Sequence, residues 1–251
     1  METNFPGYAR FFRLGEKRKR SVFAGRFAES DQESIADRLL RGTPQHLAEP
    51  PIIRHNAGPD RPKDCFWASL TVGPIISDRI VNLLREHSVT GWTTYPVRVV
   101  SRSGEELSGY QGLLPTSRCG QIDFTKGRPV PASYNPGVTY YIGGEFDPVT
   151  WDGADIFGSG TTVWIWVVER VKALLHQNGV TDIEFERLTE VEIDESNARM
   201  MNGEPWWRKY GETEDEAQAK LKLLRQENRE QVQRELAELR RRYGSSNETD
   251  E

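Results

Sequence analysis

The chain has 251 residues, of which 36% are hydrophobic and 28% are charged, and its formal net charge is −5. This composition is typical of a folded globular protein and excludes wholesale disorder. The longest apolar run covers only residues 163–168, far short of the ~20 residues that a membrane-spanning helix needs. The acidic balance argues against direct nucleic-acid binding, because neutralising phosphates requires a broad basic face.

Cysteine usage and the opening residues point to a reducing compartment. Cys65 and Cys119 form no CxxC motif, so the sequence predicts neither a zinc site nor a disulfide scaffold. Residues 1–7 lack the basic start and apolar stretch of a secretory signal. We therefore expect a cytoplasmic protein with no cofactor, no bound metal and no membrane partner.

Residues 1–60 predict an N-terminal segment with one short strand and one helix. The strand is expected at residues 8–14 and the helix at residues 30–41. Ser30 is a suitable N-cap for that helix, because Glu33 follows it at the spacing of a capping box. A connector rich in proline and glycine, at about residues 50–63, leads into the next part of the chain.

Residues 61–200 contain one pattern twice, and the second copy follows the first by 91 residues. Each copy predicts an apolar strand, a helix and a returning strand, at about residues 66–100 and 157–193. Because both copies carry the same elements, we expect an α/β or α+β fold with two strand-helix-strand units in one mixed sheet. The positions that are identical in the two copies are Thr71/Thr162, Val72/Val163, Arg79/Arg170, Leu83/Leu174, Leu84/Leu175, Val89/Val180 and Thr90/Thr181.

The C-terminal part predicts a linker followed by a long helix. Residues 201–243 comprise both, and apolar residues recur at three- and four-residue steps between 212 and 243, as in an amphipathic helix. Such a stripe allows the helix to form a homo-oligomer or to serve as an adaptor, and the sequence leaves open whether the helix folds back on the protein or projects. The tail at residues 244–251 is expected to be disordered.

An acidic stripe runs between residues 182 and 216, where twelve carboxylates face four basic residues. Such a stripe is either solvated surface or a binding face for a basic partner protein. The adjacent tryptophans that follow it either pack at a hinge or serve as aromatic anchors for a partner. The candidate partner-binding residues are Glu190, Glu192, Asp194, Glu195, Trp206 and Trp207.

A second acidic cluster lies in the irregular stretch between the two copies. Glu145, Asp147, Asp152 and Asp155 could bind a metal or act as an acid/base pair, with Cys119 as a possible thiol. Asp-Gly and Asp-Pro steps are also ordinary turn chemistry, and the spacing matches no calcium loop. This cluster supports the alternative of a small hydrolase or a metal-dependent enzyme.

Several segments resemble a known family. The segments starting Ile76-Ser-Asp-Arg-Ile and Val167-Val-Glu-Arg-Val, each followed by a Leu-Leu helix, resemble immunity proteins of bacterial polymorphic toxin systems. Residues 10–14, Arg-Phe-Phe-Arg-Leu, resemble the opening of the related myxobacterial double-CXXCG proteins. Residues 151–157 are similar to uncharacterised proteins of large-genome bacteria. The likeness covers about residues 66–193, with a further match at 8–14.

The resemblance implies a small cytoplasmic protein that neutralises a cognate toxin by covering it, without catalytic residues of its own. This chain lacks the cysteines of the double-CXXCG pattern, so their zinc site is not carried over. The expected partner is a cognate toxin or another basic protein. The sequence therefore leaves two functions open, a binding protein that uses the acidic stripe and an enzyme that uses residues 145–155.

Overall fold

The computed structural model describes residues 7–16, 22–28, 49–68, 73–131, 138–160, 164–180, 182–205, 208 and 213–220, and also 222, 223, 226, 227, 230 and 234. The chain divides into two compact units, Met1–Asn202 and Gly203–Glu251. The first unit thus spans the segments predicted at 1–60 and 61–200. Among the helices that the structure describes, none is long and apolar enough to cross a bilayer.

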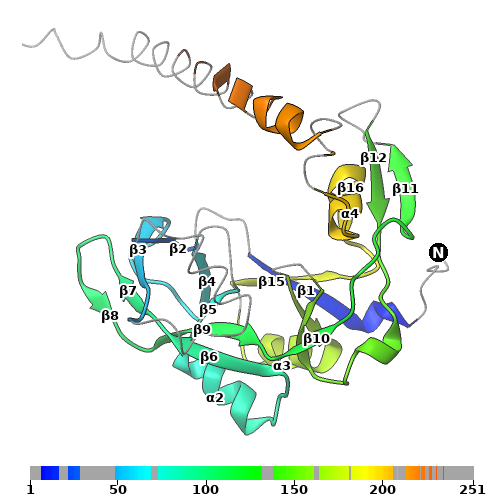
Figure 1. Ribbon diagram of the computed structural model, residues 1–251. Helices are drawn as coiled ribbons and strands as arrows, with labels where there is room; N and C mark the ends of the chain where they lie inside the picture. Colours follow the sequence, from blue (N-terminus) through cyan, green and yellow to red (C-terminus); the bar gives the residue numbers. More distant parts are fainter. Residues whose placement is uncertain are drawn as a thin grey trace, which may run out of the picture. The chain divides into compact units, whose positions relative to one another are not determined.

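The first unit is built mainly from short strands (Figure 1). Its largest sheet has eight strands in the order β6 (Trp92–Pro96), β9 (Tyr110–Pro115), β5 (Ile75–Ser77), β4 (Cys65–Ala68), β2 (Ala24–Phe27), β3 (Ile52–Ala57), β7 (Arg98–Val100) and β8 (Glu106–Leu107). The second sheet has five strands in the order β10 (Ser117–Cys119), β13 (Ile156–Ser159), β14 (Ile165–Val168), β1 (Phe11–Glu16) and β15 (Ile183–Arg187). The third is a ribbon of β11 (Arg128–Pro131), β12 (Thr139–Ile142) and β16 (Glu192–Asp194).

The described helices of this unit are short. They are α2 (Asp78–Glu86), α3 (Glu169–Gln177), α4 (Glu195–Met201) and the 3₁₀ turns η1 (Tyr8–Arg10) and η3 (Pro148–Thr150). The α2 helix begins at Ser77, whose hydroxyl accepts the Ile80 N–H, and Asp78 suits the positive end of the helix dipole. The α3 helix ends before Gly179, which has a φ of 72° that glycine adopts readily.

The expected α/β or α+β fold with one mixed sheet is wrong, because the described structure is mostly β, with sixteen strands in three sheets. Residues 101–160 show little periodicity in the sequence, yet they supply six strands of two to six residues. Such short strands are held by pairing with distant segments, and local sequence patterns do not reveal that pairing.

The two long returning strands predicted at 92–100 and 183–193 are each divided. Pro96 ends β6, and the chain then pairs as β7 with a different neighbour, β3. Arg187 ends β15, and a turn leads to β16, which pairs with β12. The long helix predicted at 212–243 lies largely outside the described residues. Residues 214–220 in the second unit are helical, and oligomerisation through this region stays a prediction.

The 91-residue spacing recurs in the elements of the first unit. The pairs α2/α3, β4/β13 and β6/β15 begin and end at positions that differ by this interval. The hairpin register also repeats, since Cys65 faces Ile76 in one copy and Ile156 faces Val167 in the other. We call β4, β5, α2 and β6 the first repeat, and β13, β14, α3 and β15 the second repeat.

Each repeat is completed by a strand from elsewhere in the chain. The strand β9 lies between β5 and β6 of the first repeat, and β1 lies between β14 and β15 of the second. In chain order, however, β1 precedes the first repeat and β9 precedes the second. The first repeat is thus completed by a strand that follows it, and the second by a strand that precedes both repeats, an arrangement like that of a strand-exchanged dimer joined into one chain.

Each repeat contains an equivalent ion pair, and the arginine of each pair also bonds to the other repeat. Arg79 pairs with Asp64 at 2.5 Å, and Arg170 pairs with Asp155 at the equivalent position of the second repeat. Arg79 also donates to the carbonyl of Asn178 beyond α3, and Arg170 donates to that of His87 beyond α2 at 3.4 Å. Because these contacts exchange roles between the repeats, the junction has approximate two-fold symmetry.

One hydrophobic core lies beneath both helices. The apolar faces of α2 and α3 pack into the same cluster, and Figure 1 shows the two helices on one side of the molecule. Both faces have the spacing of an amphipathic helix, which explains why the two copies share this pattern. The helix residues buried in this cluster are Ile80, Val81, Leu84, Val171, Leu174 and Leu175.

Candidate functional site

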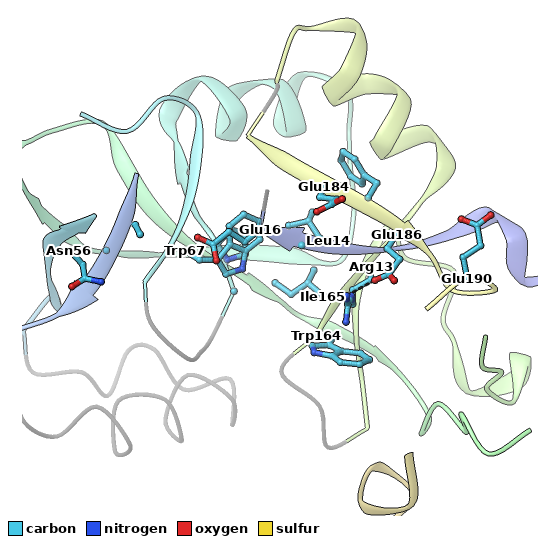
Figure 2. A pocket seen from close by; sticks show the side chains of 16 residues that line it. Arg13, Leu14, Glu16, Asn56, Trp67, Trp164, Ile165, Glu184, Glu186 and Glu190 are labelled. Carbon is cyan, nitrogen blue, oxygen red and sulfur yellow. Dashed lines mark ion pairs between the residues drawn. The ribbon is translucent and has the colours of Figure 1, made fainter. Parts of the chain in front are cut away.

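A pocket of about 920 Å³ opens between two of the sheets of the first unit (Figure 2). Strands β1 and β15 and residues 164 and 165 at the start of β14 form one side, and residues of β2, β3 and β4 form the other. Its walls are aromatic and acidic. The aromatic and charged residues that line it are Trp67, Trp164, Phe185, Arg13, Glu16, Glu184, Glu186 and Glu190.

Strand alternation brings two of these carboxylates together. Glu184 and Glu186 are two residues apart on β15, so their side chains project from the same face of the sheet. Phe185, between them, packs against the hydrophobic core under α3. Glu190 follows in the turn after β15, where its N–H donates to the carbonyl of Arg187 at 2.8 Å. The sequence Ile-Glu-Phe-Glu-Arg is thus amphipathic at strand period.

Arg13 is the one cation among the described lining residues, and it contacts both a carboxylate and an aromatic ring. It faces Glu186 across the β1–β15 pair and forms an ion pair with it. Its guanidinium carbon also lies 4.5 Å from the centre of the Trp164 ring, within the range of a cation–π contact. Figure 2 shows this side chain between Glu186 and Trp164.

The carboxylates repel one another. Burial raises the pKa of Glu186, and the charges of Glu184 and Glu190 raise it further, whereas the pairing with Arg13 opposes this shift. Four glutamates and one arginine leave the described lining with an excess of negative charge. A bound cation would relieve this repulsion, so the pocket has the electrostatic character of a cation-binding site.

The residues predicted for partner binding are separated by the structure. Glu190 lines the pocket. Glu192 is exposed on β16, while Asp194 caps α4 by accepting the Asn197 N–H at 3.0 Å. Glu195 pairs with Arg199 at 2.6 Å, one helical turn further along. The last two predicted residues, Trp206 and Trp207, lie outside the described residues.

Three of the four carboxylates of the alternative acidic site support turns and neighbouring strands. Glu145 pairs with Lys126 at 2.7 Å. Asp147 caps η3 by accepting the Val149 N–H at 3.1 Å. Asp152 accepts bonds from the Ser117 hydroxyl at 2.6 Å and from the Ala154 N–H at 3.0 Å. The bond from Ser117 lowers the pKa of Asp152, as expected for a carboxylate held in its ionised form.

Asp155, the fourth carboxylate, is buried at the junction of the repeats. It accepts from the N–H and the hydroxyl of Thr90 at 2.8 and 2.9 Å and pairs with Arg170. Burial disfavours its charge, but the bonds from Arg170 and Thr90 outweigh this penalty, and the pKa of Asp155 is lowered. Its partners come from both repeats, which gives Asp155 a structural role.

A catalytic thiol or metal centre finds little support in this region. Burial raises the pKa of Cys119 to about 12, whereas an activated thiol requires a lowered pKa. Within the described ranges, no three His, Cys, Asp or Glu side chains gather in a way that could hold a metal ion. The described pocket takes no lining residue from 118–157.

Sequence reasoning did not single out most of the pocket. Glu184 and Glu186 were counted in the acidic stripe, and their strand-period alternation with Phe185 was the available signal. Arg13 and Glu16 come from the N-terminal strand, and Trp164 and Trp67 come from the two repeats. Their meeting depends on the exchange of β1 into the second repeat.

Comparison of the chain with protein-family models and with curated proteins finds no match.

Proposed function

We propose that this protein is a binding protein that captures a cationic partner in its acidic, aromatic pocket. The observation that supports this proposal is the grouping of Glu16, Glu184, Glu186 and Glu190 around one cavity with tryptophans in its walls. An acidic recess attracts a basic surface over several ångströms and accelerates its capture.

Arg13 illustrates the kind of group that suits the pocket. Its guanidinium is held by a carboxylate, Glu186, and by the ring of Trp164. An arginine or lysine of a partner would find the same combination in Glu184 or Glu190 with an aromatic wall. Among the described residues, Glu184 has no ion-pair partner, so its charge is available to such a group.

We further propose that the partner is a bacterial toxin, which the protein neutralises in the cytoplasm by covering it. The resemblance of residues 66–193 to immunity proteins supports this choice of partner. Toxins that act on nucleic acids carry basic surfaces, and an acidic pocket complements them. In this proposal the protein performs no bond-making step, and its action depends on occupying the surface of the toxin.

Coexpression with the product of the neighbouring reading frame tests this function. We expect that product to arrest bacterial growth alone and to be harmless when this chain is present. The double variant Glu184→Lys/Glu190→Lys leaves the Arg13–Glu186 pair intact and should slow association of the purified proteins by about tenfold. It should also reduce the dependence of the association rate on salt.

A matched control separates the pocket from net charge. Glu49 and Glu86 are exposed and do not line the pocket, so Glu49→Lys/Glu86→Lys makes the same change in total charge. We expect this control to retain nearly the full association rate. Equal slowing by both double variants would show that general attraction, and not the pocket, captures the partner.

A further inference from the structure

The strand β15 lies at the end of the five-stranded sheet. Its order, β10-β13-β14-β1-β15, gives β15 a described neighbour on the β1 side only. The same strand carries Glu184 and Glu186 of the acidic pocket. Among the described residues, the edge of β15 is thus unpaired, and it meets the pocket in one element.

The ladder with β1 shows which backbone groups of β15 point outward. The Leu188 N–H donates to the Phe11 carbonyl at 2.9 Å, just beyond the paired residues. In an antiparallel pair, every second residue bonds to the partner, so Glu186 and Glu184 bond to β1. The N–H and C=O groups of Phe185 and the N–H of Arg187 are consequently directed away from β1, whereas the Arg187 carbonyl already accepts from the N–H groups of Glu190 and Val191 in the turn.

At the equivalent edge of the first repeat, a proline removes one of the outward N–H groups. There the Thr116 N–H donates to the Gly91 carbonyl at 2.8 Å, so the same alternation directs Trp92, Thr94 and Pro96 of β6 outward. Pro96 has no N–H to offer an added strand, which is how edge strands resist pairing. Its equivalent on β15 is Arg187, which keeps its N–H.

The charge on β15 selects what can pair with it. A second copy would bring its own β15 glutamates near Glu184 and Glu186, and like charges across a strand pair are destabilising. An extended segment with lysine or arginine at alternate positions would place its charges opposite these carboxylates. The edge and the pocket thus favour the same kind of partner.

We propose that β15 receives an extended basic segment of the partner as an added strand, with the alternate cationic side chains entering the acidic pocket. This inference rests on the proposed function and specifies its binding mode. Backbone bonds to the N–H and C=O of Phe185 and to the N–H of Arg187 supply affinity, and the carboxylates of Glu184 and Glu186 supply selectivity.

Synthetic peptides test the added strand directly. The probe is a capped peptide of about six residues that alternates lysine and valine, since valine favours extended structure. Two further peptides carry N-methyl groups, one on its valine amides and the other on its lysine amides. In antiparallel addition with lysines opposite Glu184 and Glu186, the valine amides face β15, so their methylation should weaken binding by about tenfold.

Methylation of the lysine amides should then leave the affinity within about twofold, because those amides face away from β15. The reverse pattern indicates a parallel strand and also supports strand addition. Equal effects of the two methylated peptides overturn the inference.

Amide hydrogen exchange provides a readout that reports on β15 itself. Binding of the unmodified peptide should slow exchange at Phe185 and Arg187, whereas Glu184 and Glu186 are already bonded to β1. One outcome separates the two proposals: the peptide binds and the Glu184→Lys/Glu190→Lys variant abolishes binding, but exchange at Phe185 and Arg187 is unchanged. That outcome supports binding by the pocket and refutes strand addition.

A pair of variants at one position completes the test. Arg187→Pro copies the proline of β6 and removes an outward N–H, whereas Arg187→Ala removes the same side chain and keeps the N–H. The proline variant should bind the peptide about tenfold more weakly than the alanine variant. Equal affinities of the two variants refute strand addition by the partner. Sedimentation gives a second test: if the wild type is a dimer and Arg187→Pro is a monomer, a second copy occupies the edge, and the inference is likewise refuted.

Discussion

The two repeats present equivalent sheet faces that have opposite character. In the second repeat, Arg13 on β1 faces Glu186 on β15, and the pair lines an open acidic pocket. In the first repeat, the same register places Gly112 on β9 opposite Tyr95 on β6. Tyr95 is only 2% exposed, and its ring occupies the space that a side chain at position 112 would need.

The equivalent position is thus packed in the first repeat and charged in the second. Burial raises the pKa of Tyr95, so the first repeat holds a neutral, packed ring at this position. The second repeat holds charges there, and burial together with the charges of Glu184 and Glu190 raises the pKa of Glu186. This grouping of carboxylates on one repeat supports the proposed binding function.

The largest expected effect concerns the packed face. Gly112→Ala would place its Cβ 2.0 Å from the Tyr95 ring, and this overlap should lower the free energy of unfolding by about 3 kcal/mol. Gly15→Ala on β1 meets only the Glu184 carbonyl at 3.8 Å and should change it by less than about 0.5 kcal/mol. Urea denaturation measures both, and equal losses would contradict the difference in packing between the two faces.

The junction offers the next effect, because its two ion pairs differ in burial. The Asp155 side chain is 8% exposed and that of Asp64 is 22% exposed. Asp155→Asn should lower the free energy of unfolding by about 2 kcal/mol, and Asp64→Asn by about half as much. Denaturant titrations of the two variants check this order.

The lowered pKa of Asp155 also predicts a pH dependence. A carboxylate whose pKa is lower in the folded state contributes stability above its unfolded pKa, and this contribution is lost as the pH falls through the folded pKa. The wild type should therefore lose more stability than Asp155→Asn on acidification. Parallel curves for the two proteins would show that the charge of Asp155 does not stabilise the junction.

The charged face should show a smaller effect that depends on pH. Binding of the lysine-valine peptide requires ionised carboxylates, and the pKa of Glu186 is raised. As the pH falls, affinity should therefore begin to weaken at a higher pH than an ordinary glutamate would give. Glu186→Gln should remove that part of the pH profile while leaving weaker binding. Calorimetric titrations between about pH 4 and pH 8 measure the affinity. An identical pH profile for the variant would show that Glu186 is not the group whose protonation weakens binding.

The smallest effect is expected from opening the edge of the first repeat. Pro96→Arg restores an outward N–H on β6 but supplies no carboxylates, since Thr93 and Tyr95 stand where β15 has Glu184 and Glu186. Peptide affinity should change by less than about twofold, and stability by less than about 0.5 kcal/mol. A clear gain in peptide binding would mean that an open edge suffices without the acidic pocket.

The sequence by itself determined the local features that depend on neighbouring residues. The spacing of the two copies and the positions of the α2 and α3 helices follow from the residue pattern, and the structure contains them at these positions. The glutamates of residues 182–216 were likewise visible as an acidic stripe. The short strands between the repeats, by contrast, could not be predicted from neighbouring residues.

Only the tertiary structure decided the sheet pairing and the pocket. Arg13 meets Glu186 and Trp164 because β1 pairs with β14 and β15 of the second repeat, which lie far from it along the chain. Strand pairing uses backbone groups that every residue except proline possesses, so the sequence of β1 does not indicate which repeat it completes. The core under α2 and α3, which both repeats share, brings these distant strands together and thereby forms the pocket.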